Sequence, residues 1–201
     1  MSRFSTGSQS GMVLLFCLMF LTALTLLGLS ASTDTIMQRQ LATNLQQTEQ
    51  AKQTARATLS WAEEWLLETQ GTAPQACVPT CEGFTLHPAG KLTAHPEFES
   101  LDWWQTHGNE AGIDPVTAER LTSIGNSAAE PALWIIELIH DLPATGENTN
   151  PELVWYRLLA RGSGQTDSAI SVVESIVAKS RDSESGSSTQ ADGRVAWREL
   201  R

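Results

Sequence analysis

The stretch MVLLFCLMFLTALTLLGL, Met12–Leu29, decides the architecture of this chain of 201 residues. A helix needs roughly 20 consecutive apolar residues to cross about 30 Å of hydrocarbon, and this run has that length. No charged residue occurs between positions 4 and 33, and the run contains no proline. We therefore predict a transmembrane helix over residues 12–33.

Two other interpretations of this segment stay open. A secretory signal peptide would have a shorter apolar core before a cleavage site of small residues, and Gly28-Leu29-Ser30-Ala31 could serve as one. A plain signal anchor would keep the segment and need no special sequence after it. Arg3 is the only basic side chain before the run, so flanking charge says little about orientation.

The next part of the chain, residues 34–70, favours a continuation of the same helix. Residues 34–67 contain neither proline nor glycine and are rich in good helix formers. Mildly apolar residues recur at helical spacing and form one stripe, namely Leu41, Leu45, Thr48, Ala55, Leu59, Ala62 and Leu66. Gly71 and Pro74 then end the helix. A coiled-coil stalk is the alternative, but sustained heptads with Leu or Ile at both core positions are missing.

Two distant segments resemble the type IV pilin family. The polar leader MSRFSTGSQSG, residues 1–11, ends in glycine directly before the apolar run, and QRQLATNLQQTEQAKQTARATLSWAEEWL, Gln38–Leu66, continues the helix. Both look most like PilX-type minor pilins. The segment WYRLLARGSGQTDSAISVVESIVAKSR, Trp155–Arg181, resembles the closing strands of the same group. The middle of the chain, residues 71–131, carries no such resemblance.

The resemblance implies a processing site and one departure from the family pattern. The prepilin peptidase would cleave between Gly11 and Met12, and Met12 would then carry an N-methylated amine. Pilins usually have a glutamate at the fifth position after cleavage, whereas this chain has Phe16 there. A carboxylate inside a bilayer is costly and normally marks a function. A subunit with no neighbour above it in the fibre would not need that carboxylate.

The C-terminal half predicts an α+β fold of the pilin kind. Three short apolar runs, ALWIIELI, LVWYRLLA and AISVVESIV, lie within residues 132–181 and are separated by turn residues. We expect an antiparallel meander whose apolar face is covered by the lower half of the long N-terminal helix.

The remaining segments have no extended apolar pattern. In residues 71–131 we expect irregular structure with short helices at Pro96–Thr106 and Pro115–Ile124, since proline favours the first helical turn. Four tryptophans are expected to supply core area, or in the case of the first two a contact patch: Trp103, Trp104, Trp134 and Trp155. Residues 182–201 begin with a stretch too polar to pack and are expected to form a flexible tail, with weak docking of the last residues, RVAWREL, as the alternative.

Cysteine usage and charge restrict the chemistry. Cys77 and Cys81 lie close together in a polar stretch, and an exported domain would favour a disulfide between them. Their spacing differs from the C-x-x-C of redox motifs, and the four ligands that zinc usually needs are not clustered. We expect no catalytic residue, metal or cofactor. The formal net charge of −10 argues against a nucleic-acid partner.

Taken with the resemblance, these patterns predict an assembly protein and not an enzyme. A PilX-type minor pilin would wait in the bacterial inner membrane with its C-terminal domain in the periplasm, and then join a priming complex near the pilus tip. Its implied partners are other minor pilins, the major pilin, a tip adhesin, the inner-membrane assembly platform and the prepilin peptidase. It would support pilus biogenesis, adhesion and twitching motility. A pseudopilin of a type II secretion system, or a signal-anchored periplasmic binding or adhesion module, are the alternatives.

Overall fold

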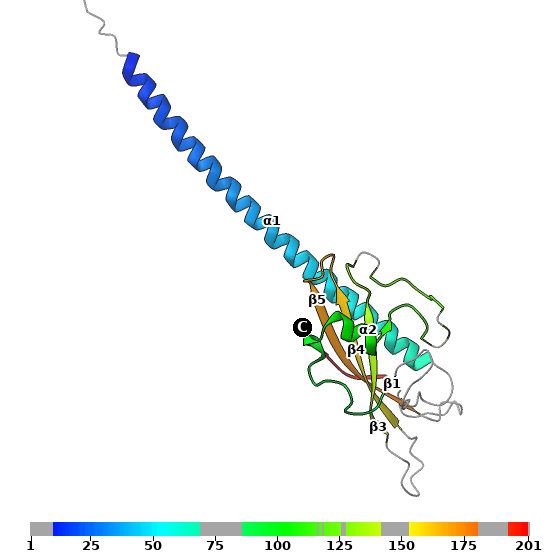
Figure 1. The fold of residues 1–201 in the computed structure, drawn as a ribbon. Helices are drawn as coiled ribbons and strands as arrows, with labels where there is room; N and C mark the ends of the chain where they lie inside the picture. Colours follow the sequence, from blue (N-terminus) through cyan, green and yellow to red (C-terminus); the bar gives the residue numbers. More distant parts are fainter. Residues whose placement is uncertain are drawn as a thin grey trace, which may run out of the picture. The chain divides into compact units, whose positions relative to one another are not determined.

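A single long helix, α1 (Ser10–Glu68), opens the computed structural model of this chain (Figure 1). The structure describes residues 10–68, 86–115, 117, 119–125, 128–141, 153–180 and 193–200. The chain divides into two units, Met1–Leu45 and Gln46–Arg201, and α1 contributes to both. The long helix follows from a sequence that has no proline in this range and is rich in Leu, Ala and Gln.

The second unit is built on one sheet. Its main strands are β3 (Leu133–Asp141), β4 (Leu153–Ser163), β5 (Ile170–Ser180) and β6 (Gly193–Glu199), each antiparallel to the next. The short β1 (Leu86–His87) and β2 (Asn109–Glu110) both pair with β3. The predicted antiparallel meander is therefore confirmed for β3, β4 and β5.

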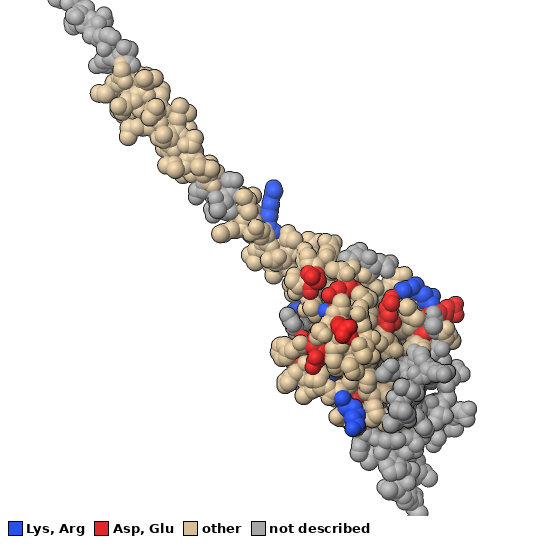
Figure 2. Space-filling view, viewed as in Figure 1, with Lys and Arg blue, Asp and Glu red and all other residues tan. Residues whose placement is uncertain are grey.

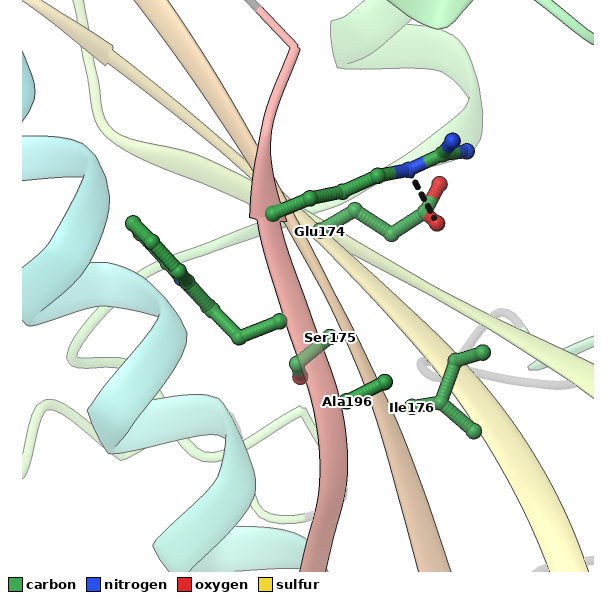
Figure 3. Close-up of a pocket in the computed structure, with 6 residues that line it drawn as sticks. Glu174, Ser175, Ile176 and Ala196 are labelled. Carbon is green, nitrogen blue, oxygen red and sulfur yellow. Dashed lines mark hydrogen bonds and ion pairs between the residues drawn. The ribbon is translucent and has the colours of Figure 1, made fainter.

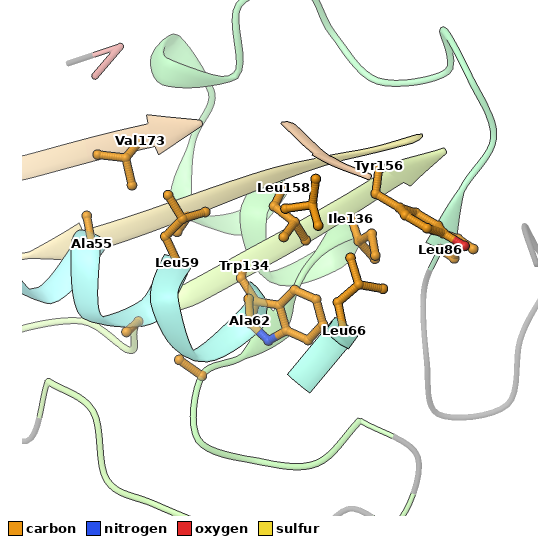
Figure 4. Close-up of a cluster of buried hydrophobic side chains, with 14 of the residues drawn as sticks. Ala55, Leu59, Ala62, Leu66, Leu86, Trp134, Ile136, Tyr156, Leu158 and Val173 are labelled. Carbon is orange, nitrogen blue, oxygen red and sulfur yellow. The ribbon is translucent and has the colours of Figure 1, made fainter. Parts of the chain in front are cut away.

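One face of the sheet packs against the lower part of α1 (Figure 4). The predicted stripe is buried in its lower part only: Ala55, Leu59, Ala62 and Leu66 are buried, whereas Leu41, Leu45 and Thr48 are exposed. They meet buried side chains of the strands, which are Trp134, Ile136, Tyr156, Leu158, Ala160, Val173 and Val177. The predicted arrangement, a long helix packed on a small sheet, is thus confirmed.

The opposite face of the sheet has a second, smaller core. The short helix α2 (Leu101–His107) supplies the buried Trp104, which lies with Leu133, Ile135, Leu159 and Val172. Alternate residues of β3 therefore point into two different cores. This explains why the run ALWIIELI is nearly continuously apolar, because a strand that is covered on both faces has no polar side to expose.

The region before β3 differs in part from the expected helices. The segment Pro96–Thr106 contains a 3-10 helix, η1 (Pro96–Phe98), followed by α2, and the Ser100 hydroxyl accepts a hydrogen bond from the Trp103 amide at the start of α2. Two elements form because Glu99 has an extended backbone.

Pro115–Ile124 was expected to be helical, and this expectation is wrong for its described residues. Ile113 and Arg120 form an isolated antiparallel bridge, and the amide of Leu121 donates to the carbonyl of Gly112. The segment therefore folds back on itself, so its backbone hydrogen bonds are made across a turn instead of along a helix.

Two expectations about the sheet need correction. The sheet is mixed, because β1 runs parallel to β3. The flexible tail predicted for residues 182–201 is wrong for Gly193–Glu199, which form β6 at the side of β5. Pairing with β5 supplies backbone partners, and α1 supplies ion pairs, that the polar composition of the tail did not reveal.

Candidate assembly surfaces

The apolar N-terminal segment is the first candidate surface. Gly11–Leu29 is the one helical segment among the described residues that is long and apolar enough to cross a membrane, and all of its side chains are exposed in the isolated chain. Its two threonines bond to carbonyls of their own helix, Thr22 to Met19 and Thr25 to Thr22, both at 2.8 Å. The segment therefore presents no polar group that needs water, and it fits a single-pass membrane anchor.

The predicted processing residues lie at the start of this segment. Gly11 and Met12 are both within α1, and the Met12 side chain is exposed. Phe16 is exposed too, and no acidic residue occurs anywhere between positions 11 and 29. The neighbouring Cys17 is exposed with a free thiol. Cleavage after Gly11 remains a prediction, since residues 1–9 of the leader lie outside the described part.

The remainder of the first unit carries large apolar side chains that nothing in the described chain covers. Ile36, Met37, Leu41 and Leu45 are each more than half exposed. Figure 2 shows how few charged atoms this unit carries, and Arg39 is its only Lys or Arg within the described range. A water-facing helix of this composition is unusual, because exposed apolar area is normally limited in a soluble protein.

The contact between α1 and β4 depends on the tripeptide Gly162-Ser163-Gly164. A Cβ atom at Gly162 would lie 2.7 Å from the Ala51 carbonyl oxygen and closer still to the Ala55 amide, and one at Gly164 would lie 2.7 Å from the Gln47 carbonyl oxygen. Backbone meets backbone here, so only glycine fits. The sequence suggested a turn at this place and did not predict the close approach.

A row of ion pairs crosses the face of the sheet that packs against α2. Arg157 bonds to Glu137 at 3.2 Å and to Glu174 at 2.7 Å, and Arg198 bonds to the other oxygen of Glu174 at 3.0 Å. Both carboxylates are buried, and Glu137 also accepts a hydrogen bond from the amide of Gly90. The Arg157 guanidinium thus lies between two buried carboxylates. These contacts connect β3, β4 and β5 to each other and to the loop at Gly90.

Side chains on the face of the sheet that packs against α1 join strand β6 to this helix. Glu199 pairs with Lys52 at 2.8 Å, and Arg56 lies over the ring of Trp197 at 5.5 Å. Arg194 donates to Glu63 at 2.8 Å, and this hydrogen bond raises the pKa of the Arg194 guanidinium above its ordinary value. Strand β6 is therefore joined to α1 by charged contacts, in addition to its backbone pairing with β5.

A shallow hollow of about 330 Å³ lies along β5 and β6. Figure 3 shows its lining, with Glu174, Ser175, Ile176 and Ala196 labelled. The Ser175 hydroxyl is buried, but the charged groups at the hollow are already engaged with each other through the pair of Arg198 and Glu174. We assign no ligand to this hollow.

A buried lysine connects the sheet to the end of the long helix. Lys179 of β5 is almost fully buried, and its ammonium group donates to the carbonyl oxygen of Leu66 at 2.6 Å. The last carbonyls of a helix have no partners within the helix, so this contact caps α1 from the sheet. A lysine in an apolar strand gave no signal of this role in the sequence.

The described residues contain no group of three or more His, Cys, Asp or Glu side chains that could hold a metal ion. Cys77 and Cys81 lie outside the described residues, so their predicted disulfide stays a prediction. The exposed His95 bonds to the largely buried carboxylate of Glu97 at 3.1 Å. Burial raises the pKa of Glu97, but hydrogen bonds from its own backbone amide and from His95 outweigh this and lower it overall.

These features together define a pilin-like subunit: an apolar helical anchor at the start of the chain, continued by a helix that packs on a small sheet. Residues 38–179 match the family described as "Type IV pilus assembly protein PilX C-term". The chain therefore belongs to the PilX family of type IV pilus assembly proteins. No curated protein and no solved structure matches the chain.

Family membership gives the chain a role in type IV pilus assembly and indicates contacts with other pilus assembly components. The family is one of assembly components, as the sequence predicted. The matched range begins within α1 and ends within β5, so β6 lies outside it.

Proposed function

We propose that this chain is a minor pilin that helps to initiate type IV pili as part of a priming complex at the pilus tip. The observation that carries the proposal is the apolar anchor of a PilX-family chain that has Phe16 where pilins usually have a glutamate. That glutamate is thought to neutralise the terminal amine of a neighbour already in the fibre. The first subunit of a fibre has no such neighbour, so an apolar residue is compatible with a tip position.

The chain would reach this position from the inner membrane. Gly11–Leu29 anchors it in a single pass, and the second unit lies in the periplasm. After processing it joins other minor pilins and a tip adhesin, and major pilin subunits are added below them by the assembly platform. Adhesion and twitching motility then depend on the chain through the number of fibres that form.

Deleting the protein tests this proposal. We expect the number of fibres on the cell surface to fall much more than the length of those that remain, because initiation limits number whereas subunit supply limits length. Immunogold labelling should place the protein at few sites, preferably fibre ends. Dense labelling along the whole shaft would overturn the tip assignment.

The Phe16→Glu variant tests the role of the apolar side chain. A glutamate in the membrane segment without a partner adds a desolvation cost. Fibre number should therefore stay nearly unchanged or fall, and Leu15→Glu one position away serves as a control for the cost of the charge alone. A rise in fibre number with Phe16→Glu would contradict the tip position.

Processing between Gly11 and Met12 is part of the proposal. Mass spectrometry of the mature protein should find N-methylated Met12 as the first residue. A mature protein that begins near Ser32 would identify an ordinary signal peptide instead and would remove the anchor on which the proposal depends. Gly11→Ala should slow processing much less than Gly11→Leu, since the scissile position requires a small residue.

The exported location also leads us to propose a disulfide between Cys77 and Cys81. Intact mass before and after reduction and alkylation measures it directly. The closed loop is short, so its loss should cost only about 2 kcal/mol in the usual entropic treatment. Alkylation of both thiols without prior reduction would show that no bridge exists.

A further inference from the structure

Strand β6 buries far less of its own surface than its neighbour β5. All residues of β6 except Gly193 are exposed, whereas nine of the eleven residues of β5 are buried. The pairing of the two strands is also interrupted by a shift in register between Ile176 and Val177. Because so little apolar area of β6 is removed from water, the hydrophobic effect contributes less to the attachment of β6 than to that of β5.

Four ion pairs connect β6 to α1 and to β5. In chain order they are Lys52 with Glu199, Arg56 with Glu199, Glu63 with Arg194, and Glu174 with Arg198. Every one of the four cationic side chains is at least 33% exposed, so solvent and its ions reach all of the pairs. Dissolved salt screens such contacts, since the range of electrostatic attraction falls to about 3 Å in 1 M salt.

The packing between β5 and β6 is incomplete as well. The hollow of about 330 Å³ lies along both strands, and Ser175 lies there opposite Trp197 (Figure 3). The Ser175 side chain is buried, and its hydroxyl has no hydrogen-bond partner among the described residues. A buried hydroxyl without a partner costs free energy. This cost disappears when β6 lifts and water reaches Ser175.

The residue after β6 attaches the strand in a different way. Leu200 packs, partly buried, against the core around Trp104, and its amide donates to the carbonyl of Val172 at 2.9 Å. An apolar contact and a backbone hydrogen bond do not depend on the attraction between ions that salt screens. The attachment of β6 is therefore sensitive to salt along the strand and insensitive at Leu200.

We propose that β6 is a strap that opens and closes over the edge of β5 while the rest of the sheet stays folded, and that dissolved salt controls it. In high salt β6 lifts from α1 and β5 and stays tethered at Leu200. Opening uncovers the backbone of β5 at this edge, and an uncovered edge can pair with another strand. The inference goes beyond the proposed function, since it depends neither on the membrane anchor nor on the pilus tip.

Thiol labelling of the full-length protein in detergent tests the strap. Ser175→Cys places a thiol beneath β6, and Ser171→Cys is the matched control, since Ser171 is equally buried on β5 but outside the residues that pair with β6. The rate of reaction with N-ethylmaleimide is measured for each cysteine separately by mass spectrometry of peptides. Between about 50 mM and about 1 M NaCl we expect the rate at position 175 to rise about tenfold, because four exposed ion pairs weaken together. The rate at position 171 should change by less than about twofold.

Hydrogen exchange of the unchanged protein measures the same opening without a substitution. Peptides from β6 should exchange faster in high salt, whereas those from β3 and β4 should not change. Ile176→Cys with Ala196→Cys allows a disulfide across β5 and β6, since the two positions lie opposite each other in the register. The oxidised double variant should lose the salt response, and reduction should restore it.

Glu63→Gln removes the charge that Arg194 meets on α1 and should act in low salt as added salt does. Combined with Ser175→Cys, it should raise the labelling rate at position 175 about threefold, since one of the four ion pairs is lost. Glu64→Gln is the matched control, because Glu64 is the next residue of α1 and is exposed. It should leave the rate unchanged.

An equal salt response at positions 171 and 175 would mean that the whole sheet loosens, and it would overturn the inference. Exchange in β6 that is the same in low and high salt would overturn it too. The proposed function is tested separately by the fibre count of the deletion strain. A deletion that reduces fibre number, with no salt response in β6, leaves the proposed function in place and removes only the strap.

Discussion

The two parts of α1 on either side of Gln46 have the same backbone and opposite surroundings. In residues 11–29 and 35–45 of the helix, every side chain whose burial the structure describes is exposed. From Gln46 to Glu68 one side of it is buried by the sheet, and the other sides carry the charges. The second part is therefore stabilised by packing within its own unit, whereas the first contains the apolar segment that fits a membrane anchor.

A single helix can thus combine an apolar segment that fits a membrane anchor with a segment that packs into a folded domain. Most helical stability in proteins comes from packing an apolar side, not from intrinsic propensity. Removing the sheet should thus affect the second part only, and changes in the first part should affect assembly without affecting the folding of the domain.

The largest loss in the free energy of unfolding is expected when the ion pairs on the sheet lose Arg157, their central cation. Arg157→Met leaves the buried Glu137 and Glu174 without the guanidinium that lies between them, which should cost about 3 kcal/mol. Thermal unfolding of the full-length protein in detergent, followed by near-ultraviolet circular dichroism, measures the loss. Helical signal from the first part of α1 should persist above the transition.

Arg120→Met is the matched control, since the pair of Arg120 and Glu110 is about half exposed on both sides and should contribute little. Equal destabilisation by the two variants would contradict the importance of burial for this chain of ion pairs.

A smaller effect is expected at the close contact of α1 with β4. Gly162→Ala introduces a methyl group against the helix backbone, which should cost about 2 kcal/mol because the helix and the strand must move apart. Gly28→Ala lies in the first part of α1 with open space around it and should leave unfolding of the domain unchanged. If both variants unfold alike, the distinction between the two parts of α1 does not hold.

The ion pair that joins β6 to α1 should contribute less to the free energy of unfolding than the contact of α1 with β4. Arg194→Ala removes the pair with Glu63, and the Arg194 side chain is about 45% exposed, so solvent screening limits the loss to about 1 kcal/mol. Faster hydrogen exchange should appear in β6 while β3 and β4 stay protected. Arg194→Lys should recover part of the protection, and loss of protection throughout the sheet would mean that β6 is needed for the whole fold.

The smallest expected effect is on how the free energy of unfolding depends on pH. The pKa of Glu97 is lowered below its ordinary 4.5, so its charged form stabilises the folded state at higher pH, and this contribution disappears as pH falls through the folded pKa. Unfolding curves for Glu97→Gln and the unchanged protein should therefore converge below the folded pKa and separate above it. The opposite pattern would mean that burial dominates the titration of Glu97.

The sequence by itself determined the parts of this protein that follow from local periodicity. The apolar run predicted the helical anchor, and the spacing from Ala55 to Leu66 predicted the buried side of α1. Three apolar runs predicted β3, β4 and β5. The resemblance in two separate segments also led to the PilX family, which the match over residues 38–179 confirms.

Tertiary structure alone decided the features that depend on residues far apart in the chain. Arg157 needs Glu137 and Glu174 from two other strands, and Lys179 caps a helix that ends more than 100 positions earlier. β6 forms because β5 offers an open side and α1 offers opposite charges, although its own composition is polar. Periodicity reports which side of an element is apolar, but a partner across the fold is chosen only when the elements are packed together.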